Sequence, residues 1–181
     1  TQGNSQSTFD VVIVGGGSAG AVLARRLSED PARRVLLLEA GRAYAASAYP
    51  DVIINANRVG GDAAHDWGYH TQDHLGLGHD VNAIRGKVLG GSSGVNAAVA
   101  IRARPADFAR WTALGIEGWA WDDVLPIFKA MENTPTGDDA WHGRSGPFPI
   151  RQRTMEEITP SMRAFVLASE AAGLARLEDF N

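Results

Sequence analysis

Residues 9–27 decide the fold, and they read FDVVIVGGGSAGAVLARRL. The apolar run 9–14 leads directly into the glycine-rich turn Gly15–Gly20, and an apolar and basic run follows as far as Leu27. This order predicts a strand, a tight turn and a helix, and in that context a G-x-G-x-x-G spacing indicates a dinucleotide-binding βαβ unit. The alternative is an ordinary βαβ crossover that binds no ligand.

Each glycine of the turn has a separate expected role. Gly15 permits the tight turn out of the strand, Gly17 lets a pyrophosphate approach the backbone, and Gly20 allows the helix to pack closely on the strand. The helix expected from about Ser18 would direct its unpaired N–H groups and its positive dipole end toward the phosphates. Gly15, Gly17, Ser18 and Gly20 are therefore predicted to bind the dinucleotide cofactor.

A second strand is predicted at residues 34–38, and it ends at Glu39. An acidic residue at about this distance from the glycine turn binds the ribose hydroxyls in dinucleotide sites. Its carboxylate would repel a 2′-phosphate, so the pattern favours a cofactor that lacks this group. The complete βαβ unit is expected to cover about residues 9–41.

Composition excludes several classes of protein. The 181 residues are 44% hydrophobic, which is enough for a domain with a core, and the net charge of −4 offers no basic surface for nucleic acid or anionic lipid. The chain has no cysteine, so disulfides, thiolate metal sites and a thiol nucleophile are excluded. No apolar run approaches the ~20 residues of a membrane span. Residues 1–8 lack the parts of a signal peptide and are expected to form a disordered leader. A cytoplasmic location is favoured, and a mature protein from which a signal peptide had been removed would show the same N-terminal sequence.

Beyond the βαβ unit, residues 42–84 lose periodicity and are expected to form long loops with one short helix near 52–59. Apolar spacing predicts three further helices. The first covers 106–114, with Pro105 in its first turn and Phe108, Trp111 and Leu114 on one face. The second runs from Asp122 or Asp123 to Glu132, with Asp122 as its cap. The third helix begins after its N-cap residue Thr159, runs to Ala172 and stops at Gly173.

A second glycine and serine turn, Gly90–Asn96, distinguishes between cofactors. Its backbone N–H groups and small side chains would let a flat ring system or the far phosphate come close. A simple nicotinamide enzyme would continue after Glu39 with alternating strands and helices, whereas this chain enters a long irregular segment. The two turns together favour FAD over NAD.

Four histidines occur between the two glycine turns, namely His65, His70, His74 and His79, with Asp66, Asp73 and Asp80 among them. His70 and His74 have the i, i+4 spacing of two metal ligands on a helix. However, glycines surround them and no glutamate follows His70 in a metalloprotease pattern. A solvated loop is therefore favoured over a metal site.

Several ordered blocks resemble the glucose-methanol-choline (GMC) family of flavoprotein oxidoreductases. The blocks are residues 12–20, 26–31, 35–41, 85–96, 101–111, 118–126, 142–147 and 179–181. The resemblance implies an α/β fold in which a Rossmann-like FAD-binding βαβ unit carries irregular excursions, as a fragment of a larger protein with an FAD-binding and a substrate-binding domain. It places the FAD-binding domain at residues 9–150, with cofactor-covering loops at about 42–84, and the truncated start of the substrate-binding domain at 151–181.

The resemblance also implies which residues contact FAD. Ser18 and Ala19 would lie on the pyrophosphate, Glu39 and Ala40 on the adenosine ribose, Trp67 beside the cofactor, and Gly91, Asn96, Ala97, Ala98 and Val99 along the flavin. Two of these residues have an alternative interpretation. Asn96 is also a typical amide that caps its own turn, and Trp67 is also a typical core ring.

Val95 occupies the position at which members resembling choline oxidase carry a histidine bonded to the flavin, so non-covalent FAD is predicted. The resemblance implies oxidation of an alcohol to an aldehyde or ketone by hydride transfer to flavin, with the electrons passing to oxygen or another acceptor. The family's catalytic pair is expected beyond Asn181, on a C-terminal remainder that is a separate chain or a missing piece. The alternatives are a hydroxynitrile lyase of the same family and a catalytically incomplete nucleotide-binding fragment that needs a partner chain.

Overall fold

The computed structural model describes residues 8–72, 76, 78–177 and 179 of the chain. The chain divides into two compact units, Thr1–Val99 and Ala100–Asn181. The predicted leader falls almost wholly outside the described residues, which begin at Thr8. Among the described residues, no helix combines the length and the apolar character that a membrane span requires.

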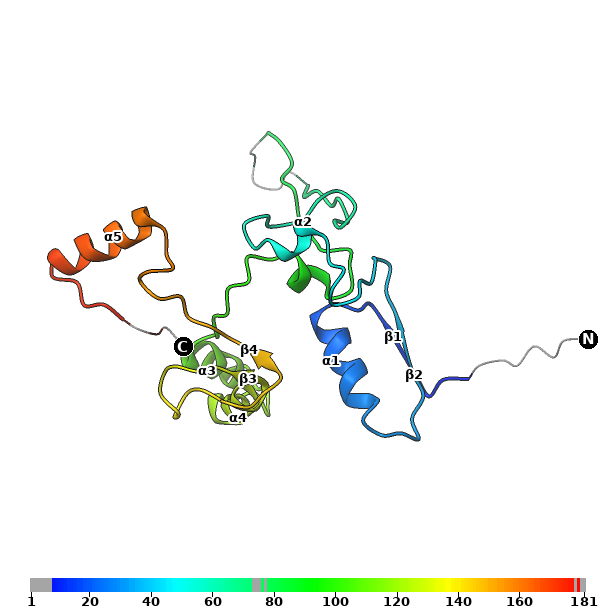
Figure 1. Cartoon of the computed structure of the whole chain (residues 1–181). Helices are drawn as coiled ribbons and strands as arrows, with labels where there is room; N and C mark the ends of the chain where they lie inside the picture. The colour runs from blue at the N-terminus through cyan, green and yellow to red at the C-terminus, as the bar shows by residue number, and fades with distance from the viewer. Residues whose placement is uncertain (1–7, 73–75, 77, 178, 180–181) are drawn as a thin grey trace, which may run out of the picture. The chain divides into compact units, whose positions relative to one another are not determined.

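The first unit begins with the predicted βαβ arrangement. Strands β1 (Val11–Val14) and β2 (Val35–Leu38) pair in parallel, and helix α1 (Ser18–Leu27) connects them (Figure 1). The register places Val11 opposite Val35 and Val14 opposite Leu38. The α/β class and the βαβ unit are thereby confirmed.

The two faces of β1 differ in burial because successive side chains of a strand point to opposite sides. Ile13 is buried and lies against the α1 side, close to Gly20, whereas Val12 and Val14 are exposed. Helix α1 therefore covers one face of the two-stranded sheet, and no described element of this unit buries Val12 and Val14 on the other.

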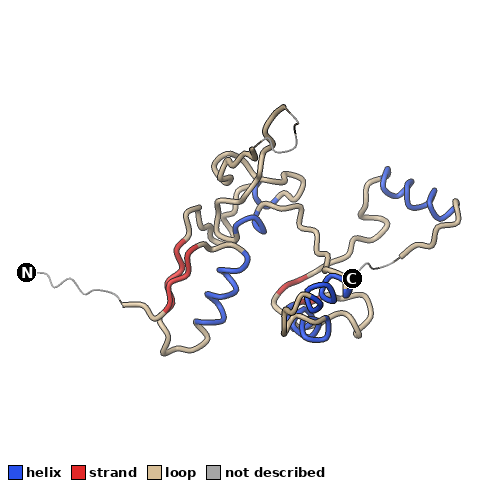
Figure 2. Tube along the Cα trace, turned by 180° about the vertical axis from the view of Figure 1, so that it is seen from behind, coloured by secondary structure: helices blue, strands red, loops and turns tan. Residues whose placement is uncertain are grey.

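Between β2 and the second glycine turn the chain is mostly loop (Figure 2). One short helix, α2 (Asp51–Ile54), lies there. The predicted helix at 52–59 was wrong in its length, because the chain turns at Asn55. The Asn55 side chain accepts a hydrogen bond from the Asn57 N–H at 3.0 Å, and this local turn competes with further helix.

The second unit contains three longer helices and two very short strands. The helices are α3 (Pro105–Ala113), α4 (Trp121–Met131) and α5 (Pro160–Ala171), and the strands are β3 (Glu132–Asn133) and β4 (Phe148–Pro149), which pair in parallel. All three predicted helices are thus confirmed. The predicted cap and stop of α5 are also confirmed, since the Thr159 hydroxyl accepts from the Met162 N–H and Gly173 follows with a φ of +88°.

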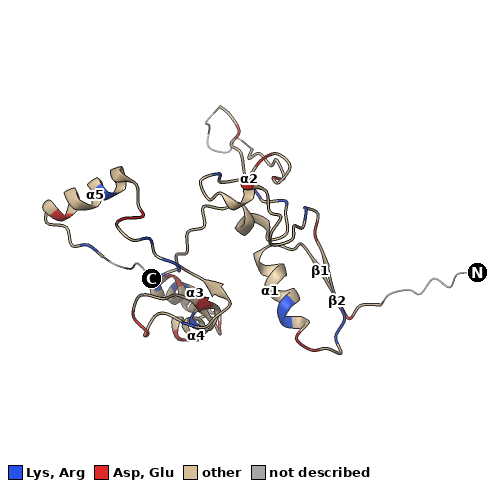
Figure 3. Cartoon of the chain, in the orientation of Figure 1, with Lys and Arg blue, Asp and Glu red and all other residues tan. Residues whose placement is uncertain are grey.

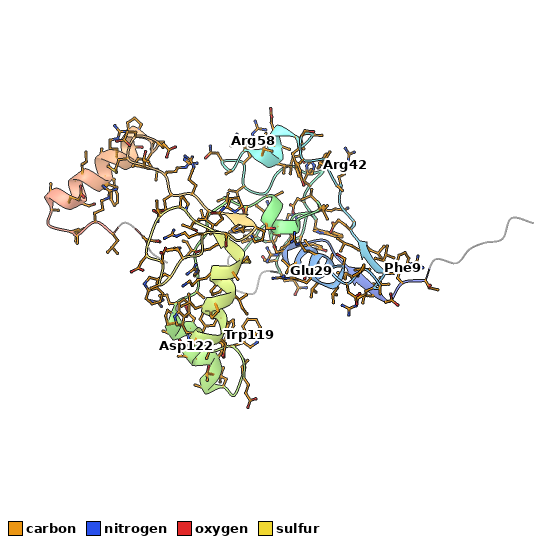
Figure 4. All side chains as sticks on the ribbon, turned by 60° about the horizontal axis from the view of Figure 1, so that its bottom comes forward. Phe9, Glu29, Arg42, Arg58, Trp119 and Asp122 are labelled. Atoms are coloured by element: carbon orange, nitrogen blue, oxygen red, sulfur yellow. The ribbon has the colours of Figure 1, made fainter. Side chains whose placement is uncertain are left out.

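Two details of α3 and α4 differ from the prediction. Helix α4 starts one residue earlier, and Asp122, labelled in Figure 4, is exposed within its first turn instead of capping it. Asp123 takes the capping role, because its carboxylate accepts the Ala120 N–H at 3.0 Å. Leu114 lies just past the end of α3 and is exposed, so it does not share the buried face of Phe108.

Four polar side chains, Arg102, Glu132, His142 and Asp179, form a polar cluster in the second unit. Glu132 is only 3% exposed, its carboxylate forms an ion pair with the Arg102 guanidinium at 2.7 Å, and it accepts from the Gly143 N–H at 2.7 Å and from His142 Nδ1 at 3.0 Å. The other ring nitrogen of His142 lies 2.6 Å from Asp179 Oδ2. The cluster therefore joins the end of α4 to three other segments of the same unit.

The protonation of Glu132 is expected to make this unit sensitive to acid. Burial raises the pKa of Glu132, but the Gly143 N–H and the Arg102 guanidinium outweigh it and hold the pKa below its ordinary value of 4.5. A lowered pKa in the folded state means that the stabilisation is full above pH 4.5 and is lost as the pH falls through the folded value. Urea unfolding of the whole protein at a series of pH values should show this loss, and Glu132→Gln should reduce the pH dependence in that range.

Candidate functional site

The first glycine turn has the backbone geometry that its spacing predicts. Gly15 has a φ of +96°, which L residues with a side chain rarely adopt, and its N–H donates to Leu38 O at 2.8 Å. A Cβ added at Gly20 would lie 1.9 Å from Gly15 O, so only glycine allows α1 to pack this close to the turn. The turn and the first residues of α1 are therefore fixed against the ends of both strands.

Gly17 differs from Gly20, since no contact among the described residues requires a glycine there. Its φ of −71° and ψ of −169° suit any residue, and an added Cβ would have Gly91 Cα, 3.9 Å away, as its nearest neighbour. The open space next to the Gly17 backbone is what a bound pyrophosphate would need.

The start of α1 is suited to an anion. Gly17 is the N-cap residue and provides no side-chain cap, and the first turn contains no acidic residue. Ser18 and Ala19 are exposed there. The cationic side chains of α1, Arg25 and Arg26, lie in its last turn (Figure 3). The favourable field at the glycine turn therefore comes from the helix N–H groups and dipole.

Glu39 lies directly behind this turn. Its Oε2 accepts the Gly16 N–H at 2.6 Å, and its Oε1 accepts the Gly41 N–H at 2.8 Å. The carboxylate thus holds the glycine turn to the end of β2, a role that sequence reasoning did not identify. Each carboxylate oxygen can accept more than one hydrogen bond, so Glu39 could accept ribose hydroxyls as well, as predicted. Ala40, the other predicted ribose contact, lies next to it and is exposed.

The two glycine turns are in direct contact. The short 3₁₀ helix η1 (Gly91–Gly94) lies beside the start of α1, and the Gly90 N–H donates to Gly16 O at 2.8 Å. Gly17 and Gly90 form a parallel bridge, and a Cβ added at Gly91 would lie 2.8 Å from Gly17 Cα. Turns more than 70 residues apart in sequence therefore form one continuous backbone surface.

Two further glycines, which the sequence showed without indicating a role, allow this close approach. A Cβ added at Gly41 would lie 2.1 Å from the carbonyl carbon of Lys87, and one at Gly86 would lie 2.3 Å from Gly91 O. The signal available in the sequence was the regular occurrence of glycine in these blocks. What it could not show was which backbone each glycine approaches.

The segment Asn96–Val99 continues from the second turn and is exposed, with Val99 at 67%. The Asn96 Oδ1 accepts the Ala98 N–H at 2.8 Å, and Ala98 has a φ of +53°. Asn96 therefore does cap its own turn, as the alternative interpretation expected. Asn96, Ala97, Ala98 and Val99 remain predicted flavin contacts, and their exposure leaves them accessible to a ligand.

Trp67 is 42% exposed and so is not a buried core ring. Its ring stacks on Tyr69 with centroids 5.8 Å apart and planes 9° apart, and Lys87 Nζ lies 5.0 Å from its centroid. The backbone N–H of Trp67 donates to Arg85 O at 3.0 Å, which connects this aromatic pair to the segment that leads into the second glycine turn. Its contact with the cofactor remains a prediction.

The histidines do not behave as one solvated group. His70 is exposed and lies 3.0 Å from Asp80, but His65 is 4% exposed, so the prediction of a solvated loop was wrong for His65. His74 and Asp73 lie outside the described residues. Within the part of the chain that the structure describes, no group of three or more His, Asp or Glu side chains could hold a metal ion.

The sequence model of the GMC oxidoreductase family matches residues 9–181. The chain belongs to this family. Among GMC-type relatives, it is 43% identical over 176 residues to a pyridoxine 4-oxidase from Microbacterium luteolum, covering 96% of this chain and 34% of that protein. It is 40% identical over 181 residues to an oxygen-dependent choline dehydrogenase from Sinorhizobium fredii, covering 95% of this chain and 31% of that protein.

Solved structures agree with this assignment. The crystal structure of pyridoxine 4-oxidase from Mesorbium loti matches with a TM-score of 0.82 at 43% identity, over 94% of this chain and 33% of that one. An FAD-dependent oxidoreductase from Chaetomium thermophilum matches with a TM-score of 0.79 at 30% identity, over 95% and 31%. This GMC chain thus spans about a third of the length of these relatives. Their names give the hydroxynitrile lyase alternative no support.

Proposed function

We propose that this chain forms the FAD-binding part of an oxidoreductase that oxidises an alcohol to an aldehyde or ketone. The observation that carries the proposal is the contact between the two glycine turns, because it creates one backbone surface beside the open space at Gly17. A pyrophosphate fits at the start of α1, and a flat ring fits against small exposed residues that follow the second turn. Family membership and the names of the relatives support the same cofactor.

The proposed roles follow the order of the chain. Glu39 and Ala40 bind the adenosine ribose, and Trp67 lies beside the cofactor. The pyrophosphate is bound by the first glycine turn and the start of α1, namely Gly15, Gly17, Ser18, Ala19 and Gly20. The flavin lies along Gly91, Asn96, Ala97, Ala98 and Val99. Bound FAD would accept hydride from the substrate carbon, which no amino-acid side chain can do. We place the base that takes the hydroxyl proton outside these 181 residues, in the part of the relatives' length that the chain does not span. The division into a domain at 9–150 and a second from 151 belongs to the same proposal.

The experiment is anaerobic reduction of the flavin in the whole protein by a panel of alcohols. The panel includes pyridoxine and choline, which the names of the relatives suggest, and simple primary and secondary alcohols. Bleaching of the flavin absorption by one class would support the proposed oxidation and identify the substrate class. A protein that holds flavin but is bleached by no alcohol would contradict it. A catalytically incomplete fragment is the second candidate, and bleaching that appears only after a partner chain is added would identify it.

Val95 predicts that the flavin is held without a covalent bond. Its side chain is buried against the loop at Gly61, and valine has no group that can form a bond with the flavin ring. Acid precipitation of the whole protein should therefore release all of the flavin into the supernatant. Flavin absorption that stays with the pellet would contradict this prediction.

A further inference from the structure

His65 is a buried side chain to which the proposed function gives no role. Its Nδ1 lies 2.6 Å from Asp62 Oδ1, and its Nε2 lies 2.6 Å from the Tyr44 hydroxyl. Tyr44 precedes it by 21 residues, so the imidazole bridges two distant points of the loop segment 42–67. The three side chains are joined by hydrogen bonds, with His65 buried at the centre, Tyr44 half-buried and the Asp62 side chain 51% exposed.

In both hydrogen bonds of the His65 ring, a donor faces an acceptor. The Asp62 carboxylate accepts from His65 Nδ1–H and also from the Ala64 N–H at 3.0 Å. The hydrogen bond from His65 holds the pKa of Asp62 below its ordinary value. In the tautomer with hydrogen on Nδ1, Nε2 accepts a hydrogen bond from the Tyr44 hydroxyl. Removing either partner would leave a buried ring nitrogen without its hydrogen bond.

The backbone of His65 connects these three hydrogen-bonded side chains to the glycine turns. His65 O accepts the Lys87 N–H at 2.7 Å, and Asp66 and Gly86 form an antiparallel bridge next to it. Lys87 in turn packs on Gly41, whose N–H donates to the Glu39 carboxylate that also accepts from Gly16. An unbroken series of backbone and side-chain contacts therefore runs from the first glycine turn to the imidazole.

We propose that His65, held between Tyr44 and Asp62, is a positioning residue that keeps the segment 42–67 against the second glycine turn and thereby retains bound FAD. The inference rests on the proposed function, because it needs FAD in the site. Burial is what distinguishes His65 from the other described histidine and aspartate pair of this region. His70 and Asp80 lie 3.0 Å apart, but their side chains are 54% and 59% exposed, and an exposed pair of this kind contributes little.

The test measures the rate of FAD dissociation from the whole protein, together with quenching of the bound flavin by iodide. The variants are Tyr44→Phe, which removes one oxygen atom from a ring of the same shape, Asp62→Ala, which removes the acceptor of His65 Nδ1–H, and the two combined. Asp80→Ala is the matched control in the exposed pair. Each single variant should release FAD about tenfold faster and expose the flavin to iodide, since a lost buried hydrogen bond costs on the order of one factor of ten.

The double variant shows whether Tyr44 and Asp62 both act by positioning His65 or each affect FAD release independently. Tyr44 and Asp62 act through the same imidazole, so the double variant should release FAD about as fast as the faster single variant. A rate equal to the product of the two single effects would overturn the inference, and so would single variants that match Asp80→Ala. Wild-type protein that holds no flavin would instead overturn the proposed function and, with it, the role of His65.

Discussion

Gly17→Ala is expected to leave the protein folded and to weaken FAD binding by about tenfold to 100-fold, the equivalent of ~1–3 kcal/mol of overpacking against the ligand. The added methyl group would have Gly91 Cα, 3.9 Å away, as its nearest described atom outside the adjoining residues, and the backbone at this position is extended. It would, however, occupy the space next to the turn that the pyrophosphate needs. Titration of the apo-protein with FAD and thermal unfolding without FAD measure the two effects separately.

Gly20→Ala is the matched comparison in the same turn. Its added Cβ would lie 1.9 Å from Gly15 O, so the start of α1 must move away from β1 before any ligand binds. Thermal unfolding of the apo-protein should therefore shift for Gly20→Ala and stay unchanged for Gly17→Ala. Equal FAD affinity in Gly17→Ala and wild type would show that no phosphate lies against this turn.

Glu132→Gln is expected to destabilise the second unit by about 3–5 kcal/mol, because it removes one partner of a buried ion pair and leaves the others in place. Arg102 and His142 both depend on this carboxylate, and the side chains of Arg102, Glu132 and His142 are at most 10% exposed. Glutamine preserves the volume, so the loss measures charge and hydrogen bonding. Urea unfolding of the whole protein, followed by tryptophan fluorescence, reports it, since Trp141 O also accepts from Arg102.

Glu157→Gln is the control for this prediction. Glu157 pairs with Arg151 in the same unit, but both side chains are exposed, and water screens such pairs so that they contribute little to stability. If Glu132→Gln cost no more than Glu157→Gln, the polar cluster would not be a source of stability in this unit.

The βαβ unit could be predicted from the sequence because its signals are local. A strand, a glycine turn and a helix follow one another within residues 9–27, and each has its own periodicity or spacing. The same holds for α5, since Thr159, Pro160 and Gly173 mark its ends. The start of α4 was placed one residue late, because Asp122 and Asp123 are both typical capping residues, and only the backbone geometry shows that Ala120 is the N-cap and that Asp123 accepts its N–H.

Contacts between distant segments could not be predicted in this way. Nothing in the residues around Gly90 states that its N–H meets Gly16 O, and the role of Gly86 follows only from that approach. Histidine in a glycine-rich loop is typically solvated, so the burial of His65 depended on Tyr44 and Asp62 meeting it in the fold. The polar cluster of Arg102, Glu132, His142 and Asp179 was missed for the same reason, because its members come from four separate segments.

The central claim is that the two glycine turns together form one site for FAD. Calorimetric titration of the whole apo-protein with FAD and, separately, with NAD tests this claim most directly. The account predicts one FAD bound per chain, with NAD bound far more weakly, because the second turn provides the surface for the flavin. Tighter binding of NAD than of FAD, or no binding of either, would contradict it.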